Sequence, residues 1–333
     1  MNGSGIKDVW SMEAWVALEE RARSRAMKAG SEDGAWRALN RHARRVMRAY
    51  TTSFFIVSRF LPRAKREEVE AVYAAVRYPD EVVDTFPLAD DEKLRLLDEW
   101  REHYEAGITC DSLNETLLRG VPPSLAGFTH VVRRRRIPAE HYRAFLEAMR
   151  RDVAPRPFAS LDDLIDSYVY GSAVVVGYFL AHVYGASGGH SFPRALAAAR
   201  DLGIALQLTN FLRDVAEDQS RGRVYIPLDA LRAEGIEALD ACDPRQREPL
   251  ARVLRRLTGV AADYYARAEA ALDAFSPDCR LAVHACIKVY GRLGERVAQA
   301  DAATSRVSVP LKEKFQALPP SKYWRIPLAY LTR

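Results

Sequence analysis

The chain has 333 residues, of which 48% are hydrophobic and 28% charged, with a formal net charge of +5. This composition excludes a disordered or fibrous protein and suffices for one large helical domain or two smaller ones. Four cysteines without C-x-x-C spacing argue against a disulfide framework and indicate a cytoplasmic protein. The first residues do not resemble a signal peptide. The longest apolar stretch, residues 173–184, is too short to span a bilayer and predicts a buried helix.

Helical periodicity dominates the chain, whereas strand-like alternation of apolar and polar residues is nearly absent. We therefore predict an all-α fold. The predicted helices are Ser11–Lys28, Glu32–Tyr50, Arg63–Tyr78, Asp90–Glu105, Ala139–Arg151, Leu161–Tyr184, Pro193–Asp218, Pro249–Phe275 and Asp278–Ala300. Because proline removes a helical hydrogen bond, Pro79 predicts a kink, or a helix that restarts with the proline at its first position.

The first acidic pair lies near the end of the third predicted helix. Asp80 and Asp84 are four residues apart on one helix face, where like charges repel unless a cation lies between them. Carboxylates at this spacing suit Mg²⁺, which leaves positions for water and phosphate oxygens. Tyr73 and Arg77 share this face, and a guanidinium there can orient a carboxylate or bind a phosphate. For one pair alone, the alternative is an ordinary solvated helix face.

The sharpest basic run is Arg133 to Arg136. Together with the positive net charge it suggests a nucleic-acid-binding protein, but the chain contains no nucleic-acid-binding motif and a charge run is usually a solvated face. We therefore expect no nucleic-acid partner. Peripheral attraction to anionic lipids at a membrane surface is the alternative that we retain.

The second acidic pair lies on a helix with apolar surroundings. Gln207, Asn210, Asp214 and Asp218 form one polar stripe, and the other positions up to Val215 are mostly Leu, Phe and Val. An ordinary amphipathic surface helix has a narrower apolar arc. Buried amides and carboxylates cost free energy unless they are paired or bound to metal. The pattern predicts a buried helix beside a polar cavity, and two such acidic pairs facing each other would bind several Mg²⁺ ions and a diphosphate.

Together, these motifs resemble the squalene/phytoene synthase family, the head-to-head prenyl synthases of the all-α isoprenoid synthase fold. The segments that carry the resemblance are Ser53-Phe54 with Leu61-Pro62, Asp80-x-x-x-Asp84, Ile137-Pro138-Ala139-Glu140, Met149-Arg150-Arg151-Asp152, Tyr168-x-Tyr170-Gly171-Ser172-Ala173-x-x-x-Gly177, Gln207-x-x-Asn210-x-x-Arg213-Asp214-x-x-Glu217-Asp218, Arg221–Pro227 and Arg306–Pro310. They extend from about Ser53 to about Lys314. Three positions depart from the family: Pro79 directly precedes Asp80, Glu81 replaces a common second aspartate, and Ala216 replaces a common glycine.

The resemblance implies a single-domain fold with a central active-site cavity and dependence on Mg²⁺, with Mn²⁺ as an alternative. We divide the chain into an N-terminal helical region over residues 1–49, a catalytic core over 50–318 and a C-terminal tail over 319–333. The implied metal ligands are Asp80, Asp84, Asn210, Asp214 and Asp218. The residues implied to bind substrate are Ser53, Arg77, Ala173, Gly177, Gln207, Asn210, Arg213, Tyr225 and Arg306. The residues implied in catalysis are Tyr73, Arg77, Tyr168, Arg213 and Tyr290. For the tyrosines, core packing is the alternative, and for the small residues it is close helix packing.

The implied reaction joins two prenyl diphosphates. One ionises, the double bond of the second attacks its allylic cation, and a cyclopropylcarbinyl diphosphate forms. A second ionisation and rearrangement then gives a C1–C1′ linked hydrocarbon. Two C20 substrates would give phytoene, which the segments Tyr168–Gly177 and Arg221–Pro227 favour. Two C15 substrates would give dehydrosqualene, presqualene diphosphate or, with NADPH, squalene.

Three alternatives bear on this interpretation. NADPH is disfavoured, but not excluded, because no G-x-G-x-x-G follows a strand. A non-catalytic family member acting as an assembly factor is the alternative from another class, and the intact acidic motifs argue against it. The run from Gln207 to Asp214 argues against a head-to-tail elongase or a terpene cyclase, which share the fold. The oligomeric state is not predicted.

Overall fold

The structure is a computed structural model that describes residues 10–189 and 192–299, together with 310, 316, 318–323 and 325–326. Within that part, every regular element is a helix, apart from an isolated bridge between Ala186 and Phe275. The all-α prediction is confirmed. The chain divides after Val153 into two compact units, residues 1–153 and 154–333, which are described separately. The predicted boundaries at residues 49 and 318 stay a prediction.

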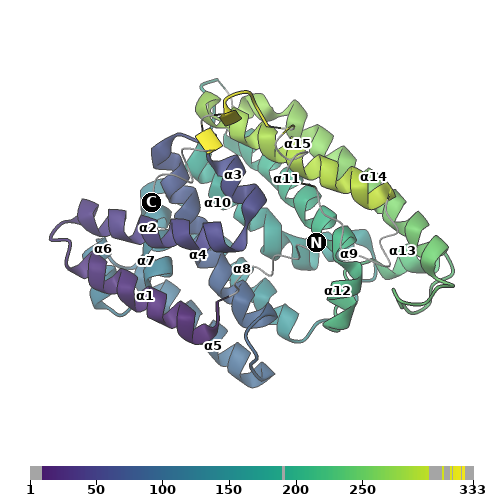
Figure 1. The fold of residues 1–333 in the computed structure, drawn as a ribbon, viewed down its shortest axis with the longest axis horizontal. Helices are drawn as coiled ribbons and strands as arrows, with labels where there is room; N and C mark the ends of the chain where they lie inside the picture. Colours follow the sequence, from purple (N-terminus) through teal and green to yellow (C-terminus); the bar gives the residue numbers. More distant parts are fainter. Residues whose placement is uncertain are drawn as a thin grey trace, which may run out of the picture. The chain divides into compact units, whose positions relative to one another are not determined.

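The first unit contains eight helices, coloured purple to teal in Figure 1. They are α1 (Met12–Met27), α2 (Glu32–Tyr50), α3 (Thr52–Ser58), α4 (Arg63–Asp84), α5 (Asp90–Ile108), α6 (Leu113–Leu118), α7 (Pro123–Arg135) and α8 (Ala139–Val153). Serine side chains begin several of them: Ser31 accepts a hydrogen bond from the backbone N–H of Gly34 at 3.2 Å. Helix α4 packs against three other helices of the unit, α2, α7 and α8.

The second unit is built around α11, which packs against α10, η1, α14 and α15. Its elements are α9 (Leu161–Leu164), the π-helix η1 (Ile165–Val174), α10 (Val175–Tyr184), α11 (Phe192–Arg213), α12 (Val215–Ser220), α13 (Leu228–Arg232), α14 (Arg247–Ala270), the 3₁₀ turn η2 (Leu272–Ala274) and α15 (Pro277–Gln299). The long helices α14 and α15 lie side by side (Figure 1). Nearly all of the second acidic motif therefore lies on or beside the central helix of its unit.

Most predicted helices match the observed ones within a few residues, and helix α7 is the main omission. From Pro123 to Thr129 this helix is buried on every side, so it shows none of the apolar periodicity used to find helices. The basic run from Arg133 to Arg136 forms the last turn and the C-cap of this helix, where positive charge complements the helix dipole. Arg135 there donates from Nε to Oε2 of the buried Glu68 at 2.7 Å. The run is thus accounted for by the fold of the first unit.

Pro79 neither ends nor restarts a helix, because α4 continues through it from Arg63 to Asp84. The predicted restart is wrong, the alternative of a kink stays a prediction, and the structure shows how the interruption is tolerated. Pro79 has no N–H to donate to the carbonyl of Ala75, one turn earlier. The hydroxyl of Tyr142 in α8 donates to that carbonyl instead, at 2.8 Å. Trp100 in α5 in turn donates from Nε1 to the Tyr142 hydroxyl at 2.8 Å.

The elements α9, η1 and α10 form one continuous helical run, Leu161–Tyr184, that is longer than the apolar stretch expected from sequence. By length and composition alone this run passes the test for a membrane span, with a mean hydropathy of 1.4 over its best window. Half of that window is buried inside the protein, and core helices of soluble proteins pass the same test. Ten residues of the run are π-helical, a geometry that is rare and often associated with functional sites.

Candidate active site: two acidic helix segments

In the first unit, the acidic motif occupies the last two turns of α4 and is organised by Arg77. The guanidinium donates from Nη1 to Oδ2 of Asp80 at 2.6 Å and from Nη2 to Oε1 of Glu81. Asp80 is partly exposed, with 37% of its side chain accessible, whereas the Glu81 side chain is fully buried. Asp84 is the last residue of the helix and is partly buried. The accessible carboxylates are therefore Asp80 and Asp84, and Glu81 points into the protein.

Glu81, the second ion-pair partner of Arg77, and the ring of Tyr50 fix the position of the guanidinium. The ring of Tyr50, the last residue of α2, lies 4.5 Å from the guanidinium carbon. Burial raises the pKa of Glu81, which the charge of Arg77 partly offsets. Burial opposes the charge of Arg77, but Asp80 and then Tyr73 and Glu81 outweigh it and raise the pKa of the guanidinium. Arg77 is thus a permanent cation held beside an accessible carboxylate.

Two further predicted residues lie close to this segment in the chain or in space. Tyr73 stands one turn before Arg77 on α4, and its ring lies 6.1 Å from that of Phe54 in α3. Ser53 precedes Phe54 and is partly buried. Thr51 begins α3 by accepting a hydrogen bond from the N–H of Phe54 at 3.2 Å. The short helix α3 thereby places its first turn beside the face of α4 that carries Tyr73.

In the second unit, the acidic motif spans a break between two helices. Helix α11 ends at Arg213, Asp214 adopts a non-helical conformation, and α12 begins at Val215, so the single helix predicted over 193–218 is wrong at this point. Two backbone bonds still bridge the break, from Asp214 N to Asn210 O at 3.0 Å and from Asp218 N to Asp214 O at 2.8 Å. Backbone bonds of helical spacing are therefore kept on both sides of the non-helical Asp214.

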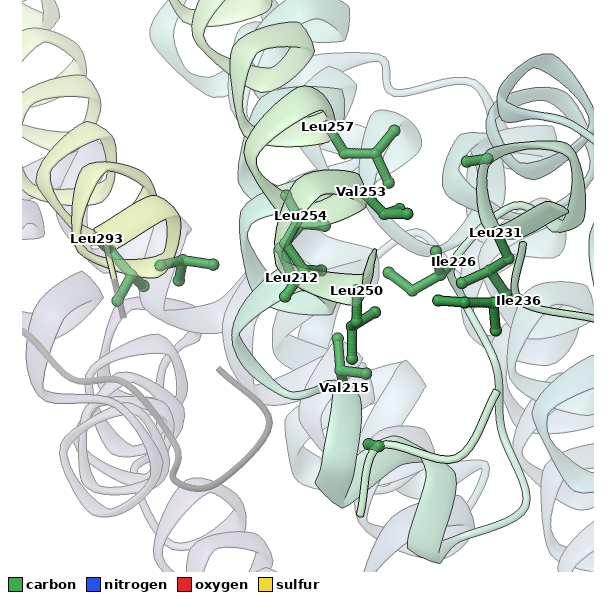
Figure 2. Close-up of a cluster of buried hydrophobic side chains, with 13 residues drawn as sticks. Leu212, Val215, Ile226, Leu231, Ile236, Leu250, Val253, Leu254, Leu257 and Leu293 are labelled. Atoms are coloured by element: carbon green, nitrogen blue, oxygen red, sulfur yellow. The ribbon is translucent and has the colours of Figure 1, made fainter. Parts of the chain in front are cut away.

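The break is anchored by a cluster of buried aliphatic side chains (Figure 2). Leu212 and Val215, on either side of the break, both belong to it. The other buried members are Ile226, Ala230, Leu231, Ile236, Ala241, Leu250, Val253, Leu254, Leu257, Leu293 and Val297. Because the residues before and after the Arg213–Asp214 pair are packed into the core, the pair between them is held in a fixed place.

Arg213 and Asp214 form a two-point ion pair between chain neighbours. The guanidinium donates from Nε to Oδ1 at 2.8 Å and from Nη2 to Oδ2. Burial opposes the charge of Arg213, but the hydrogen bonds and charge of Asp214 outweigh it and raise the pKa of the guanidinium. Tyr290 of α15 also helps to raise the pKa of Arg213. Burial raises the pKa of the Tyr290 phenol itself, which therefore stays neutral.

The remaining predicted residues of the polar stripe lie on the same segment. Gln207 and Asn210 in α11 and Asp218 in α12 are all partly buried. Asp218 also lines a small crevice whose other walls are Phe211, Val215, Arg223, Val224, Tyr225, Ile226 and Leu239. Asp218 is the one residue of the polar stripe in the lining of this crevice, which is too small to hold a water molecule, so the polar cavity predicted beside this helix stays a prediction.

Aromatic rings form a stack next to this crevice. The rings of Phe211 and Tyr225 lie 4.2 Å apart, and those of Tyr168 and Tyr225 lie 5.1 Å apart. The two tyrosine hydroxyls are 3.3 Å from each other. Tyr168 belongs to the π-helix η1, and the ring of Phe158 lies 5.8 Å from that of Tyr168 and 6.3 Å from that of Tyr225. Tyr168 and Tyr225, assigned separately from sequence, are therefore neighbours in one aromatic wall.

The small residues of η1 and α10 lie against α11. A Cβ atom added to Gly177 would come within 2.7 Å of the carbonyl oxygen of Ala199. A Cβ added to Gly203 would lie 3.1 Å from the carbonyl oxygen of Ala173. The helices approach closely here because glycine has no side chain, so Gly177 has a packing role. The proposed role of Ala173 and Gly177 in binding substrate stays a prediction.

The donor groups fit a metal ion and a diphosphate. Each unit offers two aspartates spaced one helical turn apart, with an arginine paired to one of them. Among the residues that the structure describes, no three or more His, Cys, Asp or Glu side chains are grouped so that they could hold a metal ion. Mg²⁺ takes few protein carboxylates and completes its shell with water and phosphate oxygens, so this chemistry suits a metal–diphosphate complex. Arg306 lies outside the described residues.

Three residues of the site were not identified from sequence. Glu81, which departs from the family pattern, forms an ion pair with Arg77. The spacing of four residues between them is the sequence signal that indicates this pair. Tyr50 lies on a different helix and Phe211 within an apolar run, so their ring contacts depend on tertiary packing.

Comparisons with known proteins agree on one family. The family model described as squalene/phytoene synthase matches residues 47–313. The 15-cis-phytoene synthase of Enterobacter agglomerans is 31% identical over 274 residues, which cover 82% of this chain and 91% of that protein. A phytoene synthase of Rhodobacter capsulatus is also 31% identical, over 77% of this chain and 72% of its own length.

Solved structures show the same fold. A dehydrosqualene synthase in complex with ligand superposes with a TM-score of 0.72 at 21% identity, covering 89% of this chain and all of that one. A squalene synthase from Alicyclobacillus acidocaldarius superposes with a TM-score of 0.63 at 24% identity, covering 82% of this chain and 96% of that one. At these identities the likeness concerns the fold alone.

Proposed function

Because the chain belongs to the squalene/phytoene synthase family, whose members are prenyltransferases, we propose that it condenses two prenyl diphosphates head to head. The proposed substrates are two geranylgeranyl diphosphates, and the product is phytoene, formed through prephytoene diphosphate. The observation that carries the proposal is the pair of aspartate–arginine motifs, one in each unit. The relatives named phytoene synthase, which are about 30% identical over most of the chain, support the choice of product.

The proposed division of labour follows from the chemistry of the side chains. Asp80 and Asp84, and separately Asn210, Asp214 and Asp218, would hold Mg²⁺. The metal would neutralise the negative charge that develops on the departing diphosphate. Arg77 and Arg213 are permanent cations and would bind phosphate oxygens, since a planar guanidinium matches phosphate geometry. Ser53, Gln207, Tyr225 and Arg306 would add hydrogen bonds or charge to the bound substrates.

Aromatic rings would protect the carbocations. Tyr73, Tyr168 and Tyr290 are proposed to face the allylic and cyclopropylcarbinyl cations, and each ring would contribute about 0.5–2 kcal/mol. The stacked wall around Tyr168 supports this assignment, because its rings lie against one another and are buried from water. Excluding water matters because water would quench the cation before rearrangement. The raised phenol pKa of Tyr290 keeps that side chain neutral, so it offers a ring and not a charge.

The principal alternative within the enzyme class uses C15 substrates. The product would be dehydrosqualene, presqualene diphosphate or, if NADPH supplies hydride, squalene. The matching family model is described as squalene/phytoene synthase and so includes both product branches, which keeps this alternative open. We further propose a cytoplasmic enzyme that associates peripherally with membranes, because its substrates and product are lipids.

The decisive experiment is a paired incubation of the purified full chain with Mg²⁺ and either the C15 or the C20 diphosphate, with and without NADPH. A C40 triene from the C20 substrate alone establishes phytoene synthesis. A C30 hydrocarbon or cyclopropyl diphosphate from the C15 substrate alone moves the chain to the alternative branch. Prenyl diphosphate binding without turnover of either substrate contradicts the proposal and favours a non-catalytic assembly factor.

A further inference from the structure

One stretch of the first unit has a charge pattern unlike the rest of the chain. Residues 34–66 contain no aspartate or glutamate, although at the average of 44 acidic residues in 333 such a stretch would hold about four. The same stretch contains nine basic residues. They are Arg37, Arg41, Arg44, Arg45, Arg48, Arg59, Arg63, Lys65 and Arg66. The positive charge of this segment therefore has no acidic residue of its own to balance it.

Five of these arginines share one side of α2. Positions 37, 41, 44, 45 and 48 fall within about 100° of arc at 3.6 residues per turn, and we call this stripe the basic face. Arg37, Arg41, Arg45 and Arg48 are exposed, and Arg44 is partly buried. The opposite side of the helix, with Ala38, Leu39, His42 and Val46 among its members, is buried against the unit. The basic face is thus the solvent side of a helix that is firmly packed on its other side.

The positive region extends from the basic face onto the start of α4. Burial lowers the pKa of Arg66, the charge of Glu70 opposes this, and the charge of Arg44 adds to it, so the two arginines lie within electrostatic range. Arg63 at the first position of α4 is also exposed, although Glu67 pairs with it at 2.8 Å. A concentration of positive charge of this kind attracts an anionic surface.

We propose that the basic face of α2 docks the protein on a bilayer of anionic phospholipid. Lipid phosphates would lie against Arg41, Arg45 and Arg48, and the indole of Trp10, 5.8 Å from the Arg45 guanidinium carbon, would sit at headgroup depth. The choice of a lipid surface rests on the proposed function, whose product is a hydrocarbon without polar atoms that has to leave water for a membrane. Helix α2 ends at Tyr50, whose ring contacts Arg77, so the docking helix leads directly to the first acidic motif.

The test measures sedimentation of the full chain with vesicles of phosphatidylcholine, with and without roughly one third phosphatidylglycerol, in the absence of Mg²⁺ and substrate. Each basic side chain near an anionic surface strengthens binding about fivefold. The triple variant Arg41→Gln, Arg45→Gln and Arg48→Gln should therefore bind anionic vesicles on the order of a hundredfold more weakly. The lysine triple at the same positions should retain binding, because it keeps the charge.

A matched control removes the same charge from the second unit. Arg232, Arg245 and Arg255 have side chains at least half exposed, and none belongs to the candidate active site. Their glutamine triple should bind vesicles like the unchanged protein. Equal weakening in both triples would show that only net charge matters and would overturn the assignment of the face.

Two further outcomes would also overturn the proposal: sedimentation that is the same with neutral and anionic vesicles, or tight binding of a short DNA duplex by a protein that ignores the vesicles. Turnover of detergent-dispersed substrate is measured in parallel. Active protein that fails to bind vesicles disproves only the docking surface, whereas inactive protein that binds vesicles disproves only the proposed function. Thermal melting confirms that each triple variant is folded.

Discussion

The two acidic segments use the same residue types but different backbones. In α4, Arg77 reaches one turn forward along an unbroken helix and contacts both an accessible aspartate and the fully buried Glu81. At the α11–α12 junction, Arg213 pairs only with its chain neighbour Asp214 among the ion pairs described, at a break in the helix. The first arginine is therefore anchored from inside the protein. The second is paired with Asp214, and core residues on either side hold that pair in place. A guanidinium is therefore held by a buried carboxylate in one unit and by the packing of its flanking residues in the other.

The largest expected effect is shared by both segments, in spite of their different backbones. Asp80→Ala and Asp214→Ala should each lower turnover by about 10³-fold or more, because each removes a proposed metal ligand that stabilises the departing diphosphate. Hydrocarbon production from C20 diphosphate at saturating Mg²⁺ measures this, with circular dichroism to confirm folding. Asp91, an exposed aspartate of α5, provides the control substitution. Near-normal turnover in either variant would refute the participation of that segment.

The second prediction separates the two segments by stability. Glu81→Ala should lower the free energy of unfolding by about 3–5 kcal/mol, because it leaves the charge of Arg77 without its buried partner. Glu217→Ala, in α12, breaks a pair with Arg221 in which both side chains are more than one third exposed, so it should cost about 1 kcal/mol or less. Urea unfolding of both variants provides the measurement. Equal losses would mean that the internal anchoring of Arg77 is unimportant.

The third prediction concerns the proline in α4, which has no counterpart in α11 and α12. Tyr142→Phe should cost about 1–3 kcal/mol, because it leaves the Ala75 carbonyl without its hydroxyl donor. Pro79→Ala restores a backbone N–H one turn after Ala75, which can donate to that carbonyl in place of the hydroxyl. Tyr142→Phe should therefore cost less stability in the Pro79→Ala background. A double-mutant cycle by thermal unfolding measures the difference. Additive losses in the cycle would show that the hydroxyl does not replace the missing helical bond.

The smallest effect concerns acid stability in the first unit. The buried carboxylate of Glu19 accepts a hydrogen bond from the N–H of Ser124 at 3.0 Å, and its Oε1 is hydrogen-bonded to Nε2 of His42, also at 3.0 Å. Burial by itself would raise the pKa of Glu19, but the charge and hydrogen bond of His42 and the bonds from Ser124 outweigh it and lower the pKa. A carboxyl with a lowered pKa stabilises the fold above its unfolded pKa, near 4.5, and loses this contribution as pH falls through the folded value.

Glu19→Gln should therefore destabilise the protein at neutral pH, by about 1 kcal/mol or somewhat more, and by less as pH falls below the unfolded value. Unfolding midpoints from neutral pH down into the acid range measure the change. Glu20→Gln, at an exposed neighbouring position, is the control. A destabilisation by Glu19→Gln that stays constant with pH would show that ionisation of this carboxyl does not contribute.

The sequence alone determined the helical fold class, most of the long helices and the two acidic motifs. These depend on local spacing: apolar residues repeating every three or four positions, and Asp80 and Asp84 one turn apart. The family resemblance was equally readable, because it depends on the order of short motifs. Helix α7 was not predicted, because its first two turns are buried on every side and have no polar face from which to recognise the helical period.

Only the tertiary structure decided how the motif residues are held. The break at Asp214 depends on Leu212 and Val215 packing into a cluster drawn from distant segments, which no local pattern records. Continuity of α4 through Pro79 depends on a hydroxyl from α8, 63 positions further along the chain from the proline. The burial of Glu81, against the partial exposure of its neighbour Asp80, likewise comes from packing. In each case the deciding contact joins residues far apart in sequence, and its free energy exists only once the helices have packed together.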